Sequence, residues 1–230
     1  PEVSIDFVCS TTRPGTYLTD TYNDLIGQTD LQFTDEINPN VDVLFLCLGH
    51  GLSGTFLQEN PMNDNTKIID LSNEFRLQKD QHYLEKSYVY GLPEYQKQTI
   101  ESAQAVANPG CFATAIQLAL LPLANEGLLQ NDVQVHAITG STGAGVKPSA
   151  TSHFSWRNNN VSWYKPFTHQ HLGEINETLK ALQSDAANIN FLPIRGNFTR
   201  GIFVSAYTTF VGNIDEAYRI FEAYYANHPF

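Results

Sequence analysis

The sequence is poor in basic residues and in cysteine. Lysine and arginine total 13 against 24 aspartates and glutamates, a formal net charge of −11. Because no basic cluster is present to neutralise phosphates, we expect no nucleic-acid-binding surface. The three cysteines (Cys9, Cys47 and Cys111) have neither the spacing of a disulfide framework nor that of a zinc finger. This usage favours a reducing, cytoplasmic setting.

Long apolar runs are also missing. No stretch approaches the ~20 apolar residues of a membrane-spanning helix, and the first residues lack the basic and apolar regions of a signal peptide. We therefore expect no association with a membrane. Within 230 residues, 42% are hydrophobic and 16% are charged. That composition is typical of a globular protein with one large or two small domains.

A glycine-rich dinucleotide-binding loop is absent near the start of the chain. A doubly wound domain that binds a dinucleotide normally begins with a strand, a G-x-G-x-x-G loop and a helix. Either the first half of the chain is not a nucleotide-binding domain, or its first unit is absent from this sequence.

The first half of the chain predicts a parallel α/β sheet. Residues 3–9, 41–48 and 67–72 are short runs rich in β-branched and apolar residues, separated by longer connections. The run at 41–48 is almost continuously apolar, which indicates a strand buried on both faces. Cys9 and Cys47 lie inside two of these runs, so we expect both in the core.

The second half predicts a separate α+β domain. Residues 112–123 have the composition of a buried helix, and residues 133–139 alternate as a strand. An apolar stripe indicates a helix over 170–182. Residues 201–211 predict a long strand, and residues 215–226 predict a helix with an acidic first turn.

The most informative motif is Asn108-Pro109-Gly110-Cys111-Phe112-Ala113-Thr114. The proline and glycine predict a turn that places Cys111 in the first turn of the following helix. Unpaired backbone N–H groups and the helix dipole favour an anion there, so we expect a lowered thiol pKa and a nucleophilic thiolate. The alternative is a small apolar residue that begins a core helix.

Two histidines stand two residues apart, His169 and His171, at the start of the helix predicted over 170–182. Imidazole can take a proton from a cysteine and return one to a leaving group near pH 7. We prefer His171 for this role, with His169 second. Two alternatives remain open: surface or capping histidines, and a zinc pair with Glu174. No further ligands at a suitable spacing support the metal, and we expect none.

The segment from Gly140 to Gly145 and the single Arg195 are weaker signals. The glycine-rich segment could form a simple turn or a nest of N–H groups for a phosphate or a cofactor edge. Arg195 follows a turn in a chain poor in arginine. It could bind a carboxylate or phosphate, or form a structural ion pair.

Taken together, these segments resemble the N-acetyl-γ-glutamyl-phosphate reductases of arginine biosynthesis. The motif around Cys111 is the specific part of the resemblance, and the other segments follow in the family's order. The segments that carry it are 70–76 (DLSNEFR), 90–94 (YGLPE), 108–114 (NPGCFAT), 139–145 (TGSTGAG), 169–175 (HQHLGEI) and 193–201 (PIRGNFTRG).

The resemblance implies a partial Rossmann-like domain over residues 1–107, bound to NADP, and a catalytic and oligomerisation domain over residues 108–230. It implies a homo-oligomer, a dimer or tetramer, acting on a small acyl phosphate. Cys111 would attack the acyl phosphate and NADPH would reduce the thioester, with His171 or His169 handling protons. The resemblance places Ser141, Gly143, Ala144 and Gly145 against the cofactor, and Arg195 and Asn108 against the substrate.

The sequence departs from the family pattern in three places. A glycine-rich unit would be expected before Pro1, and a last strand and helix after Phe230. Gly173 stands where proline is expected, which puts the helix start in doubt. Two rival activities remain: a cysteine hydrolase or acyltransferase without nicotinamide, and the carrier-linked aminoadipyl-phosphate reductase of lysine synthesis. The rival in lysine synthesis would favour a basic surface for its acidic carrier, whereas this chain is acidic. The sequence is also compatible with a folded module that has no activity by itself.

Overall fold

The computed structural model describes residues 3–145, 147 and 149–229. The chain forms two compact units, Pro1–Glu74 and Phe75–Phe230. Each is described here by itself. The domain boundary expected between residues 107 and 108 stays a prediction.

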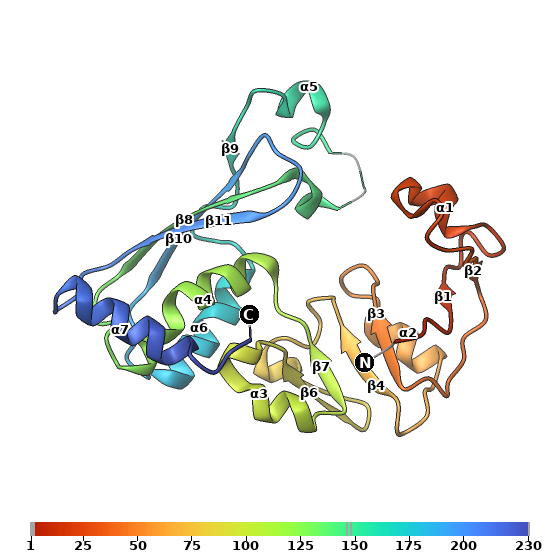
Figure 1. The fold of residues 1–230 in the computed structure, drawn as a ribbon, viewed down its shortest axis with the longest axis horizontal. Helices are drawn as coiled ribbons and strands as arrows, with labels where there is room; N and C mark the ends of the chain where they lie inside the picture. The colour runs from red at the N-terminus through yellow and green to blue at the C-terminus, as the bar shows by residue number, and fades with distance from the viewer. Residues whose placement is uncertain (1–2, 146, 148, 230) are drawn as a thin grey trace. The chain divides into compact units, whose positions relative to one another are not determined.

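The first unit contains two pairs of parallel strands (Figure 1). β1 (Val8–Cys9) pairs with β2 (Phe33–Thr34), and β3 (Val43–Leu46) pairs with β4 (Lys67–Asp70). Its helical segments are α1 (Leu18–Thr21), the 3-10 turn η1 (Asn23–Leu25) and α2 (Ser53–Glu59). The parallel arrangement expected for this half is therefore confirmed.

Two expectations for the first unit are wrong. β3 is not buried on both faces, because Val43 and Phe45 are 41% and 59% exposed while Leu44 and Leu46 are buried. The strand alternates, although its sequence is uniformly apolar. Cys47 is exposed and Cys9 is only partly buried, so neither is a core residue. Both lie at or just beyond the end of a short strand, where pairing and cover stop.

The second unit contains the remaining elements. Its strands are β5 (His82–Tyr83), β6 (Lys86–Tyr90), β7 (Ala105–Ala107), β8 (Val133–Thr139), β9 (Ser162–Trp163), β10 (Ile189–Arg195) and β11 (Ile202–Tyr207). Its helical segments are η2 (Gln78–Asp80), α3 (Pro93–Ser102), α4 (Cys111–Asn125), η3 (Ser141–Ala144), α5 (Phe154–Arg157), α6 (His171–Leu182) and α7 (Ile214–Tyr225).

A four-stranded sheet in the order β11-β8-β10-β9 organises this unit. β8 and β10 are parallel over their full lengths, from Ile189 opposite Val133 to Arg195 opposite Thr139. β11 runs antiparallel to β8, and β9 antiparallel to the end of β10. Because β8 and β10 end together, the turn after Thr139 and the side chain of Arg195 lie at the same edge of the sheet.

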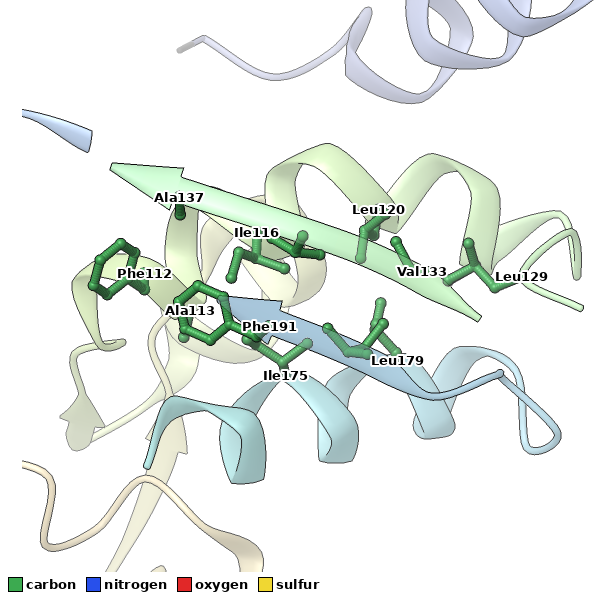
Figure 2. Packing of buried hydrophobic residues seen from close by; sticks show 13 residues of the cluster. Phe112, Ala113, Ile116, Leu120, Leu129, Val133, Ala137, Ile175, Leu179 and Phe191 are labelled. Carbon is green, nitrogen blue, oxygen red and sulfur yellow. The ribbon is translucent and has the colours of Figure 1, made fainter. Parts of the chain in front are cut away.

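Helices α4 and α6 pack against one face of this sheet and enclose the core (Figure 2). Alternate residues of β8 and β10 point into it, while Ile175 and Leu179 of α6 close it from the other side. Each such side chain contributes about 1.5–3 kcal/mol when fully buried. Phe112 and Phe191, whose ring centroids are 5.2 Å apart, close the end of the core beside Cys111.

The elements expected in the second half are confirmed, with shorter ends for the last strand. α4 begins at Cys111, so this residue lies in the first helical turn, as expected. Gly173 does not disturb the start of α6, which begins at His171. A Cβ at Gly173 would lie only 3.3 Å from Leu77 Cδ2, so the glycine allows close packing there.

Candidate active site

Cys111 is an exposed residue at the start of α4. Gly110 is the N-cap in extended backbone (φ −66°, ψ 147°), and Pro109 precedes it. The carbonyl of Gly110 accepts the helical hydrogen bond from the Thr114 N–H at 2.8 Å. Local turn chemistry thus fixes the sulfur beside the open amides of a helix N-terminus.

The pKa of the Cys111 thiol is raised, not lowered. Although the residue reaches the surface, protein atoms around the sulfur partly desolvate it and raise this pKa most, while hydrogen bonds from the backbone amides of Phe112 and Cys111 lower it. The charge of Arg76 lowers it further, and that of Glu174 raises it. The expected lowering of the thiol pKa is therefore wrong, because the effect of desolvation is larger than that of the backbone N–H groups at the helix N-terminus. A thiol that stays protonated near neutral pH needs a base before it can attack.

His169 is buried in an aromatic cage. Its ring makes edge-on contacts with Phe112, Tyr164 and Phe191, at centroid distances of 5.4–5.8 Å. Its Nδ1 accepts a hydrogen bond from the backbone N–H of His171 at 3.2 Å, at the start of α6. The pKa of His169 is lowered to about 4, mainly by burial and also by the charges of His171 and Lys165, while the charge of Glu174 partly offsets them. This imidazole is therefore neutral near pH 7.

His171 is the histidine that lies against the cysteine turn. A Cβ built on Gly110 would collide with the His171 ring, whose Cδ2 and Cε1 would lie 2.6 Å from it. Only glycine before Cys111 lets the imidazole approach this closely. The His171 Nε2 also lies 3.9 Å from Glu174 Oε1, one helical turn along α6.

Glu174 joins several elements of the site. Its Oε1 accepts from Arg76 Nη1 at 3.1 Å, in an ion pair whose side chains are 6% and 4% exposed. Its Oε2 accepts from the Tyr90 hydroxyl at 2.9 Å and from the Gly110 N–H at 2.8 Å. The carboxylate is therefore held by donors from β6, the cysteine turn and the segment before η2.

Asn108 contributes to this arrangement through its backbone. Its carbonyl accepts from Arg76 Nε at 2.8 Å, and its side-chain amide donates to the Pro109 carbonyl at 3.2 Å. Arg76 therefore holds both ends of the turn, through Asn108 on one side and Glu174 on the other. A direct contact between the exposed Asn108 and a substrate stays a prediction.

Arg195 lies at the end of β10, above the ring of Tyr164 at 4.8 Å. Among the described residues its buried Nε has no hydrogen-bond partner, and Nη1 reaches Thr151 Oγ1 only at 3.4 Å. Burial raises the pKa of Tyr164 most, a hydrogen bond from Arg195 and its charge lower it, and the charge of Cys111 raises it. Arg195 and Tyr164 therefore form a pair that senses the charge of Cys111.

Arg157 has a different, structural role. Its guanidinium is 5% exposed and donates to the backbone carbonyls of Thr151, Asn160 and Arg195 and to the Ser162 hydroxyl. Burial lowers its pKa, as does the charge of Arg195. It fixes the segment before β9 to the end of β10.

The glycine-rich segment forms η3, with Gly145 at φ 78°. The N–H groups of Gly140, Ser141 and Thr142 donate to the carbonyls of residues 201, 198 and 199, at 2.9–3.1 Å. These three amides are therefore not available to an anion. Among the described residues, no atom would lie within 4 Å of a Cβ on Gly145.

Sequence reasoning missed Arg76, Tyr90, Tyr164 and Gln117, and it considered Glu174 only as a metal ligand. Arg76 and Tyr90 lie in segments that carried the family resemblance, yet no local pattern linked them to a carboxylate 98 and 84 residues away. In the part of the chain that the structure describes, no group of three or more His, Cys, Asp or Glu residues could hold a metal ion. Within those same residues no helix is long and apolar enough to cross a membrane.

Comparisons with known proteins agree with this arrangement. Residues 1–103 match the family model for the semialdehyde dehydrogenase NAD binding domain, and residues 111–230 match the semialdehyde dehydrogenase dimerisation domain. A protein of Flavobacterium johnsoniae named N-acetyl-gamma-glutamyl-phosphate reductase is 57% identical over 231 aligned residues, which cover 100% of this chain and 71% of the relative. The chain belongs to the N-acetyl-γ-glutamyl-phosphate reductase family. It is therefore an oxidoreductase with an NAD(P)-binding domain and a dimerisation domain.

Other members of this reductase family and more distant structures extend the result. The Christiangramia forsetii reductase is 52% identical, again over 100% of this chain and 71% of its own. The aspartate semialdehyde dehydrogenase of Francisella tularensis superposes with a TM-score of 0.65 at 14% identity, covering 95% of this chain and 72% of that one. The aspartate semialdehyde dehydrogenase of Candida albicans, solved with NADP, superposes with a TM-score of 0.63 at 11% identity, covering 96% of this chain and 69% of that one. These structures confirm the semialdehyde dehydrogenase fold.

Proposed function

We propose that this chain carries the catalytic cysteine of an N-acetyl-γ-glutamyl-phosphate reductase, which forms N-acetylglutamate semialdehyde in arginine biosynthesis. The observation that carries the proposal is the meeting of Cys111, His171 and Glu174 at the N-terminus of α4. A nucleophile, a base and a group that orients the base are the parts required for covalent catalysis. The reduced cysteine also fits the expected cytoplasmic setting.

Cys111 acts first. His171 takes the thiol proton, and the sulfur attacks the acyl carbon of the acyl phosphate. A C–S bond forms, the C–O bond to phosphate breaks, and phosphate leaves with the electron pair. After reduction, the C–S bond breaks, the sulfur leaves with its electron pair and the aldehyde is released. His171 manages the protons of both steps, and the amides of Cys111 and Phe112 stabilise negative charge on the sulfur.

The nicotinamide cofactor is proposed to be NADP. When bound, it supplies the hydride that takes the thioester carbon to the aldehyde level. The amides of Gly140, Ser141 and Thr142 already donate within the chain, so at these three positions the turn offers a cofactor phosphate no free donor. Ser141, Gly143, Ala144 and Gly145 are therefore proposed to lie against the cofactor by packing.

Arg195 is proposed to bind the anionic end of the substrate. Its guanidinium lies over the ring of Tyr164, whose pKa responds to the charge of Cys111, and its buried Nε has no hydrogen-bond partner among the described residues, so it can receive a carboxylate or the phosphate of the reacting group. Asn108 is proposed as a weaker contact, because its exposed side chain stands just before the cysteine turn.

The test is phosphate-dependent reduction of NADP⁺ by the full-length protein with N-acetylglutamate semialdehyde, the reverse of the proposed reaction. Activity that requires phosphate, NADP⁺ and the semialdehyde supports the proposal. Release of free acid from an acyl phosphate without nicotinamide would instead indicate a hydrolase. Preference for NAD⁺ would overturn the choice of NADP alone.

The chain is proposed to form its homo-oligomer, a dimer or tetramer, through the outer face of the four-stranded sheet. Phe203 and Tyr207 of β11 are 67% and 65% exposed, and they stand opposite Ile138 and Gln134 of β8. Large exposed aromatic residues on one sheet face are typical of an interface. Replacing both with aspartate should lower the mass measured by light scattering, whereas an unchanged mass places the interface elsewhere.

The two histidines should differ in their effect on turnover. We expect His171→Asn to lower kcat by about 10²-fold or more, the usual effect of losing a general acid–base group. His169→Asn should lower kcat less, because His169 holds the start of α6 and is neutral. Steady-state kinetics at pH 7 with both substrates varied checks this order, and a greater loss at His169 reverses the assignment.

His169 should also make stability depend on pH. Its folded pKa of about 4 lies below the 6.5 of an exposed imidazole, so the unfolded chain binds the proton first as pH falls. The contribution of neutral His169 to the free energy of unfolding is fully present above about pH 6.5. It is lost as pH falls toward 4, by up to about 3 kcal/mol. Urea unfolding between pH 7 and 4 should show a smaller decrease in the free energy of unfolding for His169→Asn than for the native protein.

A further inference from the structure

The hydroxyl of Tyr90 donates to the carboxylate of Glu174. Tyr90 is the last residue of β6 and is 6% exposed. Its hydroxyl donates to Glu174 Oε2 at 2.9 Å and accepts from Gln117 Nε2 at 2.8 Å. The three residues come from β6, α4 and α6, so the hydroxyl joins three elements around the site.

The direction of the hydrogen bond is fixed. Gln117 Nε2 also donates to the Ala113 carbonyl at 3.0 Å, so its amide cannot turn freely. Because Gln117 donates to the phenol oxygen, the phenolic proton points to Glu174. Burial raises the pKa of Tyr90, and the charge of Glu174 raises it further, so the hydroxyl remains a donor throughout the working pH range.

The Glu174 carboxylate that Tyr90 holds contacts both the cysteine turn and His171. The same Oε2 accepts from Gly110 N–H, directly before Cys111, and Oε1 lies between Arg76 and His171. If Oε2 lost the phenol, the carboxylate could rotate about its side-chain bonds. The Gly110 amide and the His171 ring would then no longer be held in fixed positions relative to each other.

We propose that Tyr90, oriented by Gln117, is a positioning residue of the reaction, which fixes the Glu174 carboxylate between the cysteine turn and His171. The proposal rests on the proposed function in that Cys111 and His171 are taken as the reacting pair. Tyr90 acts on them through Glu174, to which its hydroxyl donates.

The charges around Glu174 set the direction of the expected effect. Arg76 faces it from the segment before η2, Cys111 from the start of α4, and His169 and His171 from the start of α6. Glu177 and Glu174 both line a cavity of about 120 Å³, together with Arg76 and Tyr90. Removing the phenol leaves the Glu174 charge less compensated, so a proton stays on Cys111 and His171 to higher pH.

The experiment compares Tyr90→Phe with Tyr95→Phe in the full-length protein. Tyr95 packs against the same apolar cluster as Tyr90, but among the described residues it does not donate to Glu174. Three quantities are measured: kcat and KM, the pH profile of kcat/KM, and the pH dependence of iodoacetamide alkylation of Cys111, located by mass spectrometry. Gln117→Leu is a third variant, which removes the donor to the phenol.

We expect Tyr90→Phe to lower kcat roughly ten- to a hundredfold, the effect of one hydrogen bond to a charged group, with KM within about threefold. The acid limb of kcat/KM and the alkylation curve should both move to higher pH, by about half to one unit. Gln117→Leu should show the same shifts, but smaller. Tyr95→Phe should match the native protein.

An unchanged kcat, or a reduced kcat with both pH curves in place, would overturn the proposal and leave Tyr90 a purely structural role. The alkylation curve needs no substrate. If the protein proved not to be a reductase, a shift of that curve would still confirm that Tyr90 acts on the cysteine turn through Glu174, so failure of the two proposals can be told apart.

Discussion

Replacing Cys111 by serine should abolish turnover, with a loss of about 10⁴-fold or more, while the fold stays intact. The serine hydroxyl has a far higher pKa than the thiol, and His171 cannot deprotonate it appreciably. The oxygen also forms an ester, which accepts hydride less readily than a thioester. Because Cys111 is exposed and the two side chains differ little in volume, the thermal midpoint should change by less than about 2 °C.

The matched control for this prediction is Cys47→Ser. Cys47 is also exposed, but it lies in the first unit, just beyond β3. We expect phosphate-dependent NADP⁺ reduction at the native rate in this variant. Full activity in Cys111→Ser would show that the reaction does not use Cys111 as a nucleophile. Equal losses of activity in both variants would show that the effect is not specific to Cys111.

Glu174→Leu should be the most destabilising single change in the site. It leaves the guanidinium of Arg76 buried without its carboxylate and removes the acceptor of Tyr90 and Gly110. Breaking a buried ion pair from one side typically costs about 3–5 kcal/mol. Urea unfolding should therefore show a lower midpoint, and turnover should fall with it because the cysteine turn loses its anchor.

Two variants make this prediction specific. Glu177 lies on the same helix, is only partly buried and accepts from the Gln78 N–H at 3.0 Å, so Glu177→Leu should cost about 1 kcal/mol or less. The double replacement of Arg76 and Glu174 by leucine should recover part of the lost stability, because no charge is left unpaired. A double variant less stable than Glu174→Leu would show that Arg76 contributes mainly through Asn108.

The sequence predicted those parts of the fold that neighbouring residues specify. The apolar stripe that includes Ile175 and Leu179 indicated α6, and the alternation over residues 133–139 indicated β8. It could not predict which face of β3 is covered, because an apolar run reads the same whether one face or two are buried. Val43 and Phe45 are therefore exposed against expectation. α3 and β10 were not predicted at all: α3 is largely polar and has no buried residues, and Pro193 interrupts the pattern of β10.

The sequence by itself determined the position of Cys111 at a helix N-terminus and of two histidines at the start of another. Proline, glycine and helix-forming residues set backbone angles within a few residues, so these features are local. Tertiary structure alone decided that the pKa of Cys111 is raised, that His171 lies against Gly110, and that Glu174 gathers donors from 64 to 98 residues away. Desolvation and long-range hydrogen bonds exist only once the chain has brought distant segments together, so no local pattern can encode them.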